Sequence, residues 1–160
     1  MDIREDDLTG DAVRGVIRAH LDQMFSQTPA ESVHALDLSG LTAPEVTFWS
    51  VWDEGEIVGC GALKELAPRH GEIKSMHTLA RFRGKGYGRA MLTHILAEAR
   101  RRDYTRISLE TGATAPFQPA QRLYRTVGFT ECGPIPGYRP DHHSLFMTLD
   151  MTGGSAQSAR

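Results

Sequence analysis

The stretch Arg83-Gly84-Lys85-Gly86-Tyr87-Gly88-Arg89 decides how this chain is interpreted. Its three glycines at alternate positions let the backbone approach a ligand closely and turn N–H groups toward it. A strand pattern precedes the stretch and an amphipathic helix pattern follows it. The free N–H groups and the positive dipole end of that helix favour an anion. The stretch therefore predicts a site for a phosphate group or a pyrophosphate, with Arg83, Lys85 and Arg89 as further donors.

Two common nucleotide-binding motifs do not fit this stretch. The P-loop requires G-x-x-x-x-G-K-[ST], a pattern that the stretch does not contain. The dinucleotide fingerprint requires G-x-G-x-x-G, and Arg89 stands where the third glycine would follow Gly84 and Gly86. That fingerprint also belongs to the first turn of a repeated βαβ fold, whereas antiparallel strands are expected before the stretch here. Both interpretations fail on spacing.

The apolar pattern outside the stretch predicts a mixed sheet with flanking helices. We expect helices over 11–24, 32–36, 90–99 and 119–127, the second one after the capping-box pattern of Thr28-Pro29-Ala30-Glu31. We expect strands near Ile3 and over 46–52, 57–66, 71–78, 106–110 and 144–149. The resulting order, β-α-α-β-β-β-α-β-α-β, indicates a mixed α/β or α+β fold.

Length and composition indicate one globular domain. The 160 residues include 40% hydrophobic and 24% charged residues, which excludes collagen, a coiled coil and wholesale disorder. We expect residues 1–150 to form the domain and residues 151–160 to form a flexible C-terminal tail, because 153–160 are small and polar.

Charge and cysteine content indicate which partners and which cellular compartment to expect. A formal net charge of −2 gives no basic field that would attract nucleic acid, and no apolar run is long enough for a membrane span. Cys60 and Cys132 make neither a disulfide framework nor a metal quartet, and residues 1–7 do not have the pattern of a signal peptide. We therefore expect a cytoplasmic protein without nucleic-acid or membrane partners.

A resemblance to a known family follows from three motifs. The first motif is R-x-x-G-x-G, which the stretch contains as Arg83, Gly86 and Gly88. The second is a Leu-x-Val-x-Pro-x-x-Arg-Gly-x-Gly pattern, which falls on Met76, Thr78, Ala80, Arg83, Gly84 and Gly86. The third is A-x-x-L-Y-x-x-x-G-F, which residues 120–129 match. In these motifs, and in element order from about Ile3 to Leu149, the sequence resembles the GNAT family of N-acetyltransferases. It departs from the family pattern at Thr78 and Ala80, which replace Val and Pro. Phe117 stands where an Asn is frequent, so a coenzyme contact from Asn is not carried over.

The resemblance implies a fold, a coenzyme and residues that bind it. The fold is a twisted, mostly antiparallel sheet that splays between its fourth and fifth strands. The acyl donor is acetyl-CoA, with no metal, and two copies of such a domain often pair through a sheet edge. The implied coenzyme-binding residues are Met76, His77, Thr78, Arg83, Gly84, Lys85, Gly86, Tyr87, Gly88 and Arg89. The backbone N–H groups of Met76 and Thr78 are expected to meet the acetyl carbonyl and the pantetheine amides.

The resemblance also implies two catalytic residues. An amine acceptor arrives protonated, and its neutral form costs roughly 4–5 kcal/mol at pH 7, so a general base is needed. Glu72 matches the strand glutamate that serves as base in relatives, and the period of two places it with Lys74 and Met76 on one face. Its alternative role is a solvated residue or an ion pair with Lys74. Tyr124 matches the tyrosine that protonates the departing thiolate, and its alternative role is aromatic packing.

The acceptor is the least determined part of the prediction. We expect a small-molecule primary amine, held by His34, Trp49, Phe117 and Tyr138, with Trp49 alternatively a core residue. The histidines do not show the spacing of a metal site. No cysteine lies beside the glycine stretch to act as a nucleophile, so we expect the acetyl group to pass directly to the acceptor. Three other functions stay open: acetylation of a protein or peptide, a non-catalytic coenzyme A-binding regulator, and a general phosphate-ligand module.

Overall fold

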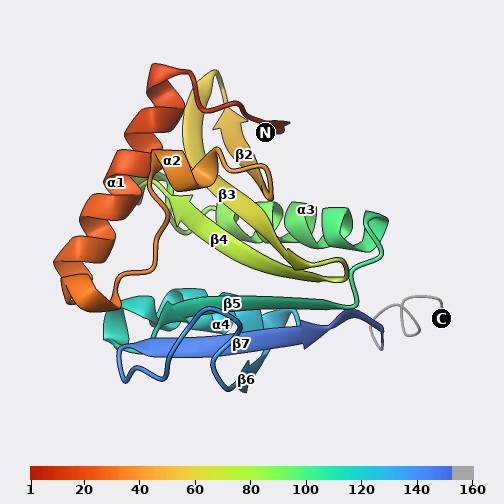
Figure 1. The fold of residues 1–160 in the computed structure, drawn as a ribbon. Helices are drawn as coiled ribbons and strands as arrows, with labels where there is room; N and C mark the ends of the chain where they lie inside the picture. Colours follow the sequence, from red (N-terminus) through yellow and green to blue (C-terminus); the bar gives the residue numbers. More distant parts are fainter. Residues whose placement is uncertain (153–160) are drawn as a thin grey trace.

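One seven-stranded sheet organises the computed structural model, which describes residues 1–152 (Figure 1). Its spatial order is β1-β2-β3-β4-β5-β7-β6. The strands are β1 (Asp2–Glu5), β2 (Val46–Asp53), β3 (Glu56–Ala67), β4 (His70–Thr78), β5 (Arg106–Gly112), β6 (Thr130–Cys132) and β7 (Ser144–Asp150). Only β4 and β5 pair in parallel among these described strands. The expected mixed, mostly antiparallel sheet is confirmed.

Helices cover both faces of this sheet (Figure 1). Helices α1 (Asp11–Gln27) and α2 (Leu38–Leu41) lie on one face, and α3 (Tyr87–Arg101) and α4 (Gln118–Thr126) lie on the other. Short 3-10 turns precede α2, α3 and α4, at Ala30–Ser32, Ala80–Phe82 and Ala115–Phe117. None of the helices in residues 1–152 has both the length and the apolar composition that a membrane crossing requires.

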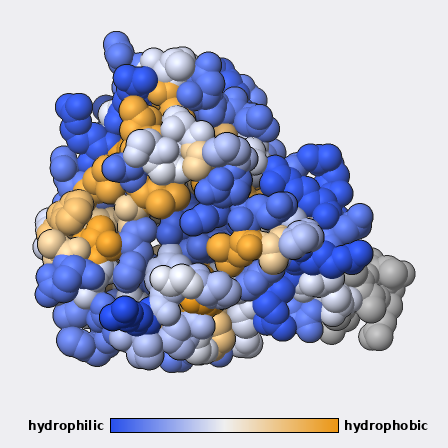
Figure 2. Space-filling view, in the orientation of Figure 1, coloured by the Kyte–Doolittle hydropathy of each residue, from blue (hydrophilic) through white to orange (hydrophobic). Residues whose placement is uncertain are grey.

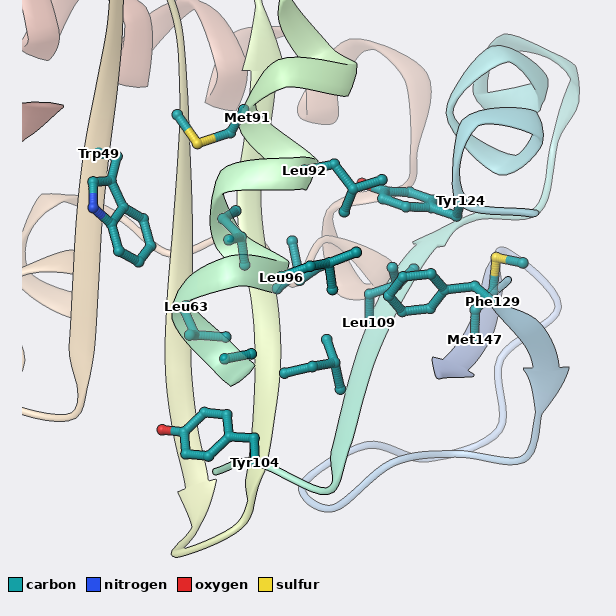
Figure 3. Packing of buried hydrophobic residues seen from close by; sticks show 14 of the residues in the cluster. Trp49, Leu63, Met91, Leu92, Leu96, Tyr104, Leu109, Tyr124, Phe129 and Met147 are labelled. Atoms are coloured by element: carbon teal, nitrogen blue, oxygen red, sulfur yellow. The ribbon is translucent and has the colours of Figure 1, made fainter. Parts of the chain in front are cut away.

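Two apolar cores fix these layers. The larger core lies between the sheet and α3 with α4, and Figure 3 shows Leu92 of α3 beside Tyr124 of α4 and Leu96 of α3 pointing toward β5. The apolar stripe expected on this helix is buried, at Met91, Leu92, Ile95, Leu96 and Ala99. The smaller core lies between α1, α2 and the opposite face, where it includes Val13, Val16, Leu41 and Phe48. Each fully buried side chain of this size contributes roughly 1.5–3 kcal/mol to folding.

The sheet opens between β4 and β5. Their pairing runs from His70 opposite Arg106 to Ile73 opposite Leu109, and beyond these residues the strands diverge (Figure 1). The backbone of β4 therefore loses its β5 partner in the second half of the strand. This is the splay between the fourth and fifth strands that the family resemblance implied.

A β-bulge in β4 changes which side chains share a face. Ala62 lies opposite Lys74 and Cys60 opposite His77, so that two residues of β4 oppose Gly61, and Ser75 has a φ of 54°. A bulge shifts the alternation by one residue. Met76 consequently packs against the α3 core, whereas Ala62, the partner of Lys74, belongs to the α1 core. The expectation that Met76 shares a face with Glu72 is wrong for this reason.

A helix and a strand also differ from the prediction. The segment expected as a helix over 32–36 holds only the end of a 3-10 turn, and helix α2 begins after Asp37, whose carboxylate accepts the Gly40 N–H. Asp37 is thus the N-cap, a role that the capping-box pattern assigned to Thr28, and Thr28 instead ends α1. Strand β6 was not expected, because only three residues form this edge strand.

The domain continues past its expected end at residue 150. Met151 is 3% exposed in the larger core, and its N–H donates to the Thr105 carbonyl. The rest of the expected tail, from 153 onward, lies outside the described residues. On the face drawn in Figure 2, apolar residues gather over α1, and most of the remaining surface is hydrophilic. Phe25 of α1 is 56% exposed.

Candidate functional site

A cavity of about 620 Å³ occupies the opening between β4 and β5. Its walls come from α1, the segment after α1, the second half of β4, the glycine stretch, the end of β5 and the start of α4, with Tyr138 and His143 from the β6–β7 connection. The cavity therefore joins the predicted anion site at one end to the predicted catalytic residues at the other.

The glycine stretch forms a backbone cradle. Gly84 and Gly86 have φ values of 77° and 91°, and a Cβ atom at either position would meet no described atom within 4 Å. These left-handed conformations favour glycine, and both residues line the cavity. Helix α3 starts at Tyr87 with Gly86 as its N-cap, and no side chain of the described residues caps that end. Its first-turn N–H groups are thus available to an anion, and the cradle fits the pyrophosphate of a coenzyme.

Hydrogen bonds hold the arginines around this cradle. Arg83 Nε donates to the Thr78 carbonyl at 3.0 Å, and Arg83 Nη2 donates to Gln23 Oε1 of α1 at 2.6 Å. Arg89 Nη2 donates to Thr126 Oγ1 of α4 at 2.9 Å. The two cations are positioned from both sides of the cavity.

The coenzyme-binding residues expected from the sequence lie together, with one exception. Met76, His77, Thr78 and the stretch from Arg83 to Arg89 line the cavity except for Lys85. Lys85 is exposed, and its Nζ lies over the Phe82 ring at 5.8 Å from the ring centroid.

Glu72 lies in a buried hydrogen-bonded network. Its Oε2 atom accepts a hydrogen bond from the Tyr138 hydroxyl at 2.5 Å and one from Lys74 Nζ at 3.3 Å. Lys74 Nζ also donates to the Tyr138 oxygen at 2.7 Å and to the His34 carbonyl at 3.1 Å. Glu72 is 2% and Lys74 8% exposed. The ion pair that the sequence left as an alternative for Glu72 is therefore present, and burial and the adjacent carboxylate raise the pKa of Tyr138.

Glu110 is a second carboxylate in the cavity, and the sequence did not single it out. It follows Leu109 on β5, at the point where β5 leaves β4. Burial is the main cause that raises its pKa, Ser144 and Lys74 lower it, and Glu72 raises it further. Its place at the end of the strand expected over 106–110 was the only signal available in the sequence.

Tyr124 projects from α4 to the same cavity. It is 6% exposed, and its ring meets the Phe129 ring edge-on with centroids 5.7 Å apart (Figure 3). Burial, and to a lesser extent the Glu110 charge, raises its pKa. The hydroxyl is thus protonated at neutral pH and can act as a proton donor.

Three of the four expected acceptor residues line the cavity. His34 and Tyr138 pack edge-on with centroids 4.8 Å apart. Phe117 covers Gly112, where a Cβ atom would lie 2.0 Å from Phe117 Cδ2. His34, Phe117 and Tyr138 all line the cavity. Trp49 does not line the cavity, because it is paired with Gly61 and lies on the α3 face of the sheet (Figure 3). Its ring packs there against His94.

A histidine pair forms the α1 side of the cavity. His20 Nδ1 and His77 Nδ1 lie 3.1 Å apart. Burial lowers the pKa of His20 to about 4 and that of His77 to about 3, and nearby Lys74 and Arg83 add to this effect. Both rings are therefore neutral at pH 7. The resemblance included His77 among the coenzyme-binding residues without a role for its side chain, and the bulge at Ser75 turns that side chain toward α1.

The β6–β7 connection brings Asp141, His142 and His143 together, with their ligand-type atoms within 4.8 Å of one another. The Asp141 carboxylate accepts the N–H of His143 at 2.9 Å. Hydrogen bonds from Ser32 and His143 lower the pKa of Asp141. This grouping is a hydrogen-bonded turn at the rim of the cavity.

Comparison with known proteins agrees with this geometry. The model of the Acetyltransferase (GNAT) family matches residues 13–129. The uncharacterized N-acetyltransferase YsnE of Bacillus subtilis is 51% identical over 148 residues, which cover 92% of this chain and 98% of that protein. The IAA acetyltransferase of Azospirillum brasilense is 41% identical over 120 residues, 74% of this chain and 77% of that protein. An aminoglycoside 6'-N-acetyltransferase solved in complex with coenzyme A has the same fold, with a TM-score of 0.70 at 14% identity, over 94% of this chain and 97% of that chain.

Proposed function

The chain belongs to the GNAT family of acyl-CoA-dependent acetyltransferases, and on that premise we propose that it transfers an acetyl group from acetyl-CoA to the primary amine of a small molecule. The observation that carries this proposal is the single cavity that joins the glycine cradle to Glu72 and Tyr124. A general phosphate-binding module would need the cradle alone.

The chain would hold the coenzyme mainly through backbone groups. The N–H groups of the cradle and of the first turn of α3 would bind the pyrophosphate, with Arg83 and Arg89 beside them. The half of β4 beyond Ile73 has no β5 partner in the described sheet, so its backbone can bind the pantetheine arm around Met76 and Thr78. Acetyl-CoA, when bound, supplies the thioester that the amine nitrogen attacks, so that a C–N bond forms as the C–S bond breaks.

Glu72 is our candidate for the general base. Hydrogen bonds from Lys74 and Tyr138 to its Oε2 atom hold the carboxylate in place. Because Glu72 is only 2% exposed, we propose that it takes the proton of the amine through a bridging water molecule. Tyr124 is our candidate for the acid, because it lines the cavity that joins the glycine cradle to Glu72, where the departing thiolate would need a proton.

The walls beside Glu72 favour a small acceptor over a protein. The segment after α1 and the β6–β7 connection both line the cavity and meet where His34 contacts Tyr138. The relative named IAA acetyltransferase is consistent with a small-molecule acceptor. Acetylation of a protein or peptide is the second candidate, and a regulator that binds coenzyme A without catalysis is the third. Cytoplasmic location and pairing of two copies through a sheet edge stay predictions from the sequence.

A thermal-shift titration with acetyl-CoA, beside ATP and NAD, tests the coenzyme. A ligand at 100 times its Kd adds about 2.7 kcal/mol to the free energy of unfolding, which raises the Tm of a chain of this size by roughly 5–11 °C. A shift with acetyl-CoA alone supports the proposal. A larger shift with ATP or NAD contradicts it.

Release of coenzyme A thiol then tests the acceptor. The panel contains putrescine, tyramine, L-aspartate and a tetrapeptide with one lysine, each with wild type, Glu72→Gln and Tyr124→Phe. Turnover of a free amine that falls in both variants, with the acetyl-CoA shift retained, supports the full proposal. Turnover of the peptide alone favours the second candidate, and a shift without any turnover favours the third.

A further inference from the structure

Glu110 is a carboxylate that lines the cavity, and the reaction proposed above does not use it. Glu72, by contrast, has its Oε2 atom bonded to both Lys74 and Tyr138. None of the ion pairs among residues 1–152 includes Glu110. The two carboxylates therefore have different surroundings within one cavity.

The sheet register places both carboxylates on the same face. Glu72 lies opposite Ser108, and Glu110 follows Ser108 by two residues, so all three side chains point to the side of the sheet that α1 covers. Pairing ends at Ile73 and Leu109, immediately before Lys74 and Glu110. The Glu110 and Lys74 side chains consequently stand on either side of the opening.

The charged side chains around Glu110 leave an excess of negative charge in this part of the cavity. Lys74 is ion-paired with Glu72, and these two charges offset each other. The other titratable groups that act on Glu110 are Asp141, which is anionic, and the Tyr124 and Tyr138 hydroxyls, which are neutral because their pKa values are raised. Glu110 is thus a half-buried carboxylate with the neutral Ser144 hydroxyl as a hydrogen-bond donor and with no ion pair inside residues 1–152, and it offers a binding site to a cation that enters the cavity.

We propose that Glu110 binds the protonated amine of the acceptor beside Glu72, and that it thereby selects cationic primary amines. The acceptor ammonium would supply the ion-pair partner that Glu110 does not have among residues 1–152. Bound there, the nitrogen lies near the carboxylate that we propose as its proton acceptor. This inference rests on the proposed function, because the ammonium in question is that of the acetyl acceptor.

Carbon-13 NMR with methylammonium chloride tests the binding site without knowledge of the natural acceptor. Methylammonium is the smallest primary ammonium, and the carboxyl carbon of Glu110 is assigned in glutamate-labelled protein from the signal that Glu110→Gln removes. We expect a saturable shift of this signal with methylammonium and no such shift with sodium chloride at equal ionic strength. Equal responses to the two salts would overturn the proposal.

Steady-state kinetics test selection of the amine, with the panel amine that wild type acetylates best. We expect Glu110→Gln to raise the KM for that amine by about 10–100-fold, the loss of one hydrogen bond to a charged group, and to leave the KM for acetyl-CoA within about twofold. Glu110→Asp should restore part of the loss, and Glu131→Gln on exposed β6 is the matched control. An unchanged amine KM in Glu110→Gln contradicts the inference. If no panel amine is acetylated, the acceptor part of the proposed function fails, and the methylammonium titration still decides the role of Glu110.

Discussion

Lys74 Nζ lies 3.3 Å from Glu72 Oε2, two residues away on the same strand, and both side chains are buried. The Tyr138 hydroxyl donates a hydrogen bond to Glu72 Oε2 and accepts one from Lys74 Nζ. The Lys74 ammonium also donates to the His34 carbonyl. One cation thus connects β4 with the segment after α1 and with the β6–β7 connection. The walls around the acceptor and the candidate base are held by the same group.

Lys74→Met should therefore destabilise the protein strongly. Removal of the ammonium leaves the Glu72 carboxylate buried without its cation, which typically costs about 3–5 kcal/mol. For a chain of this length we expect the Tm to fall by roughly 6–20 °C. Urea unfolding of Lys74→Met at pH 7, followed by tryptophan fluorescence, measures the loss.

The double variant Glu72→Gln/Lys74→Met separates charge from packing. It removes both charges, so we expect most of the stability to return while acetyl transfer stays low. A double variant as unstable as Lys74→Met would mean that the aliphatic part of Lys74, and not its charge, stabilises this region.

Gly86→Val tests the backbone cradle. Its φ of 91° strains any residue with a branched Cβ, at about 1–3 kcal/mol, and the new side chain would occupy the open space that the pyrophosphate needs. We expect the acetyl-CoA thermal shift to disappear while the fold persists. Gly55→Val is the matched control, since Gly55 has a φ of 79° in the β2–β3 turn, also with no described atom within 4 Å of its Cβ position. It should lose similar stability and keep the shift; loss of the shift in both variants would contradict the assignment.

The parts of the fold that local patterns determine could be predicted from the sequence. The stripe from Met91 to Ala99 follows the helical period, and the glycine stretch identifies the start of α3, because both signals lie within a few residues. The splay came from the family resemblance, whereas the parallel pairing of β4 with β5 was not predicted. Strand β6 was missed because a three-residue edge strand has almost no pattern of its own.

The side chains of the site were harder to predict because they depend on register. The bulge at Ser75 turns Met76 to the α3 core and His77 to α1, and no residue type announces such a bulge. Trp49 faces the α3 side because it pairs with Gly61, a partner known only once the strands are aligned. Glu110 enters the cavity only through the divergence of β4 and β5.

The buried pair of His20 and His77 should make stability depend on pH. A folded-state pKa of about 4 for His20 and about 3 for His77, against about 6.5 when unfolded, means that the unfolded chain binds protons first as the pH falls. The stabilising effect is full above pH 6.5 and is lost as the pH falls toward the folded values. At pH 5 each histidine should cost on the order of 2 kcal/mol relative to pH 7.

Urea titrations at pH 7, 6 and 5 measure this dependence. We expect His20→Gln/His77→Gln to lose stability less steeply over this range than wild type, with His142→Gln, an exposed histidine, as control. Parallel pH dependences in wild type and the double variant would show that other groups cause the loss.

Gly112→Ala should disturb the wall of the cavity where β5 meets α4. A Cβ atom at this position would lie 2.0 Å from Phe117 Cδ2, which is closer than any real contact, so the ring must move. The Gly112 carbonyl is also held by Gln121 Nε2 at 2.8 Å, and the strand therefore cannot easily shift instead. We expect Gly112→Ala to lower the free energy of unfolding by about 1–3 kcal/mol, as for an overpacked core position, and to change the amine KM because Phe117 lines the cavity.

Phe117→Ala in the same chain removes the clash and should restore most of the stability. Gly133→Ala, with open space around its Cβ position in the described chain, should have little effect. Calorimetry and amine kinetics on the four variants of the Gly112–Phe117 cycle measure the coupling, and strictly additive effects would mean that the two residues do not contact each other in solution.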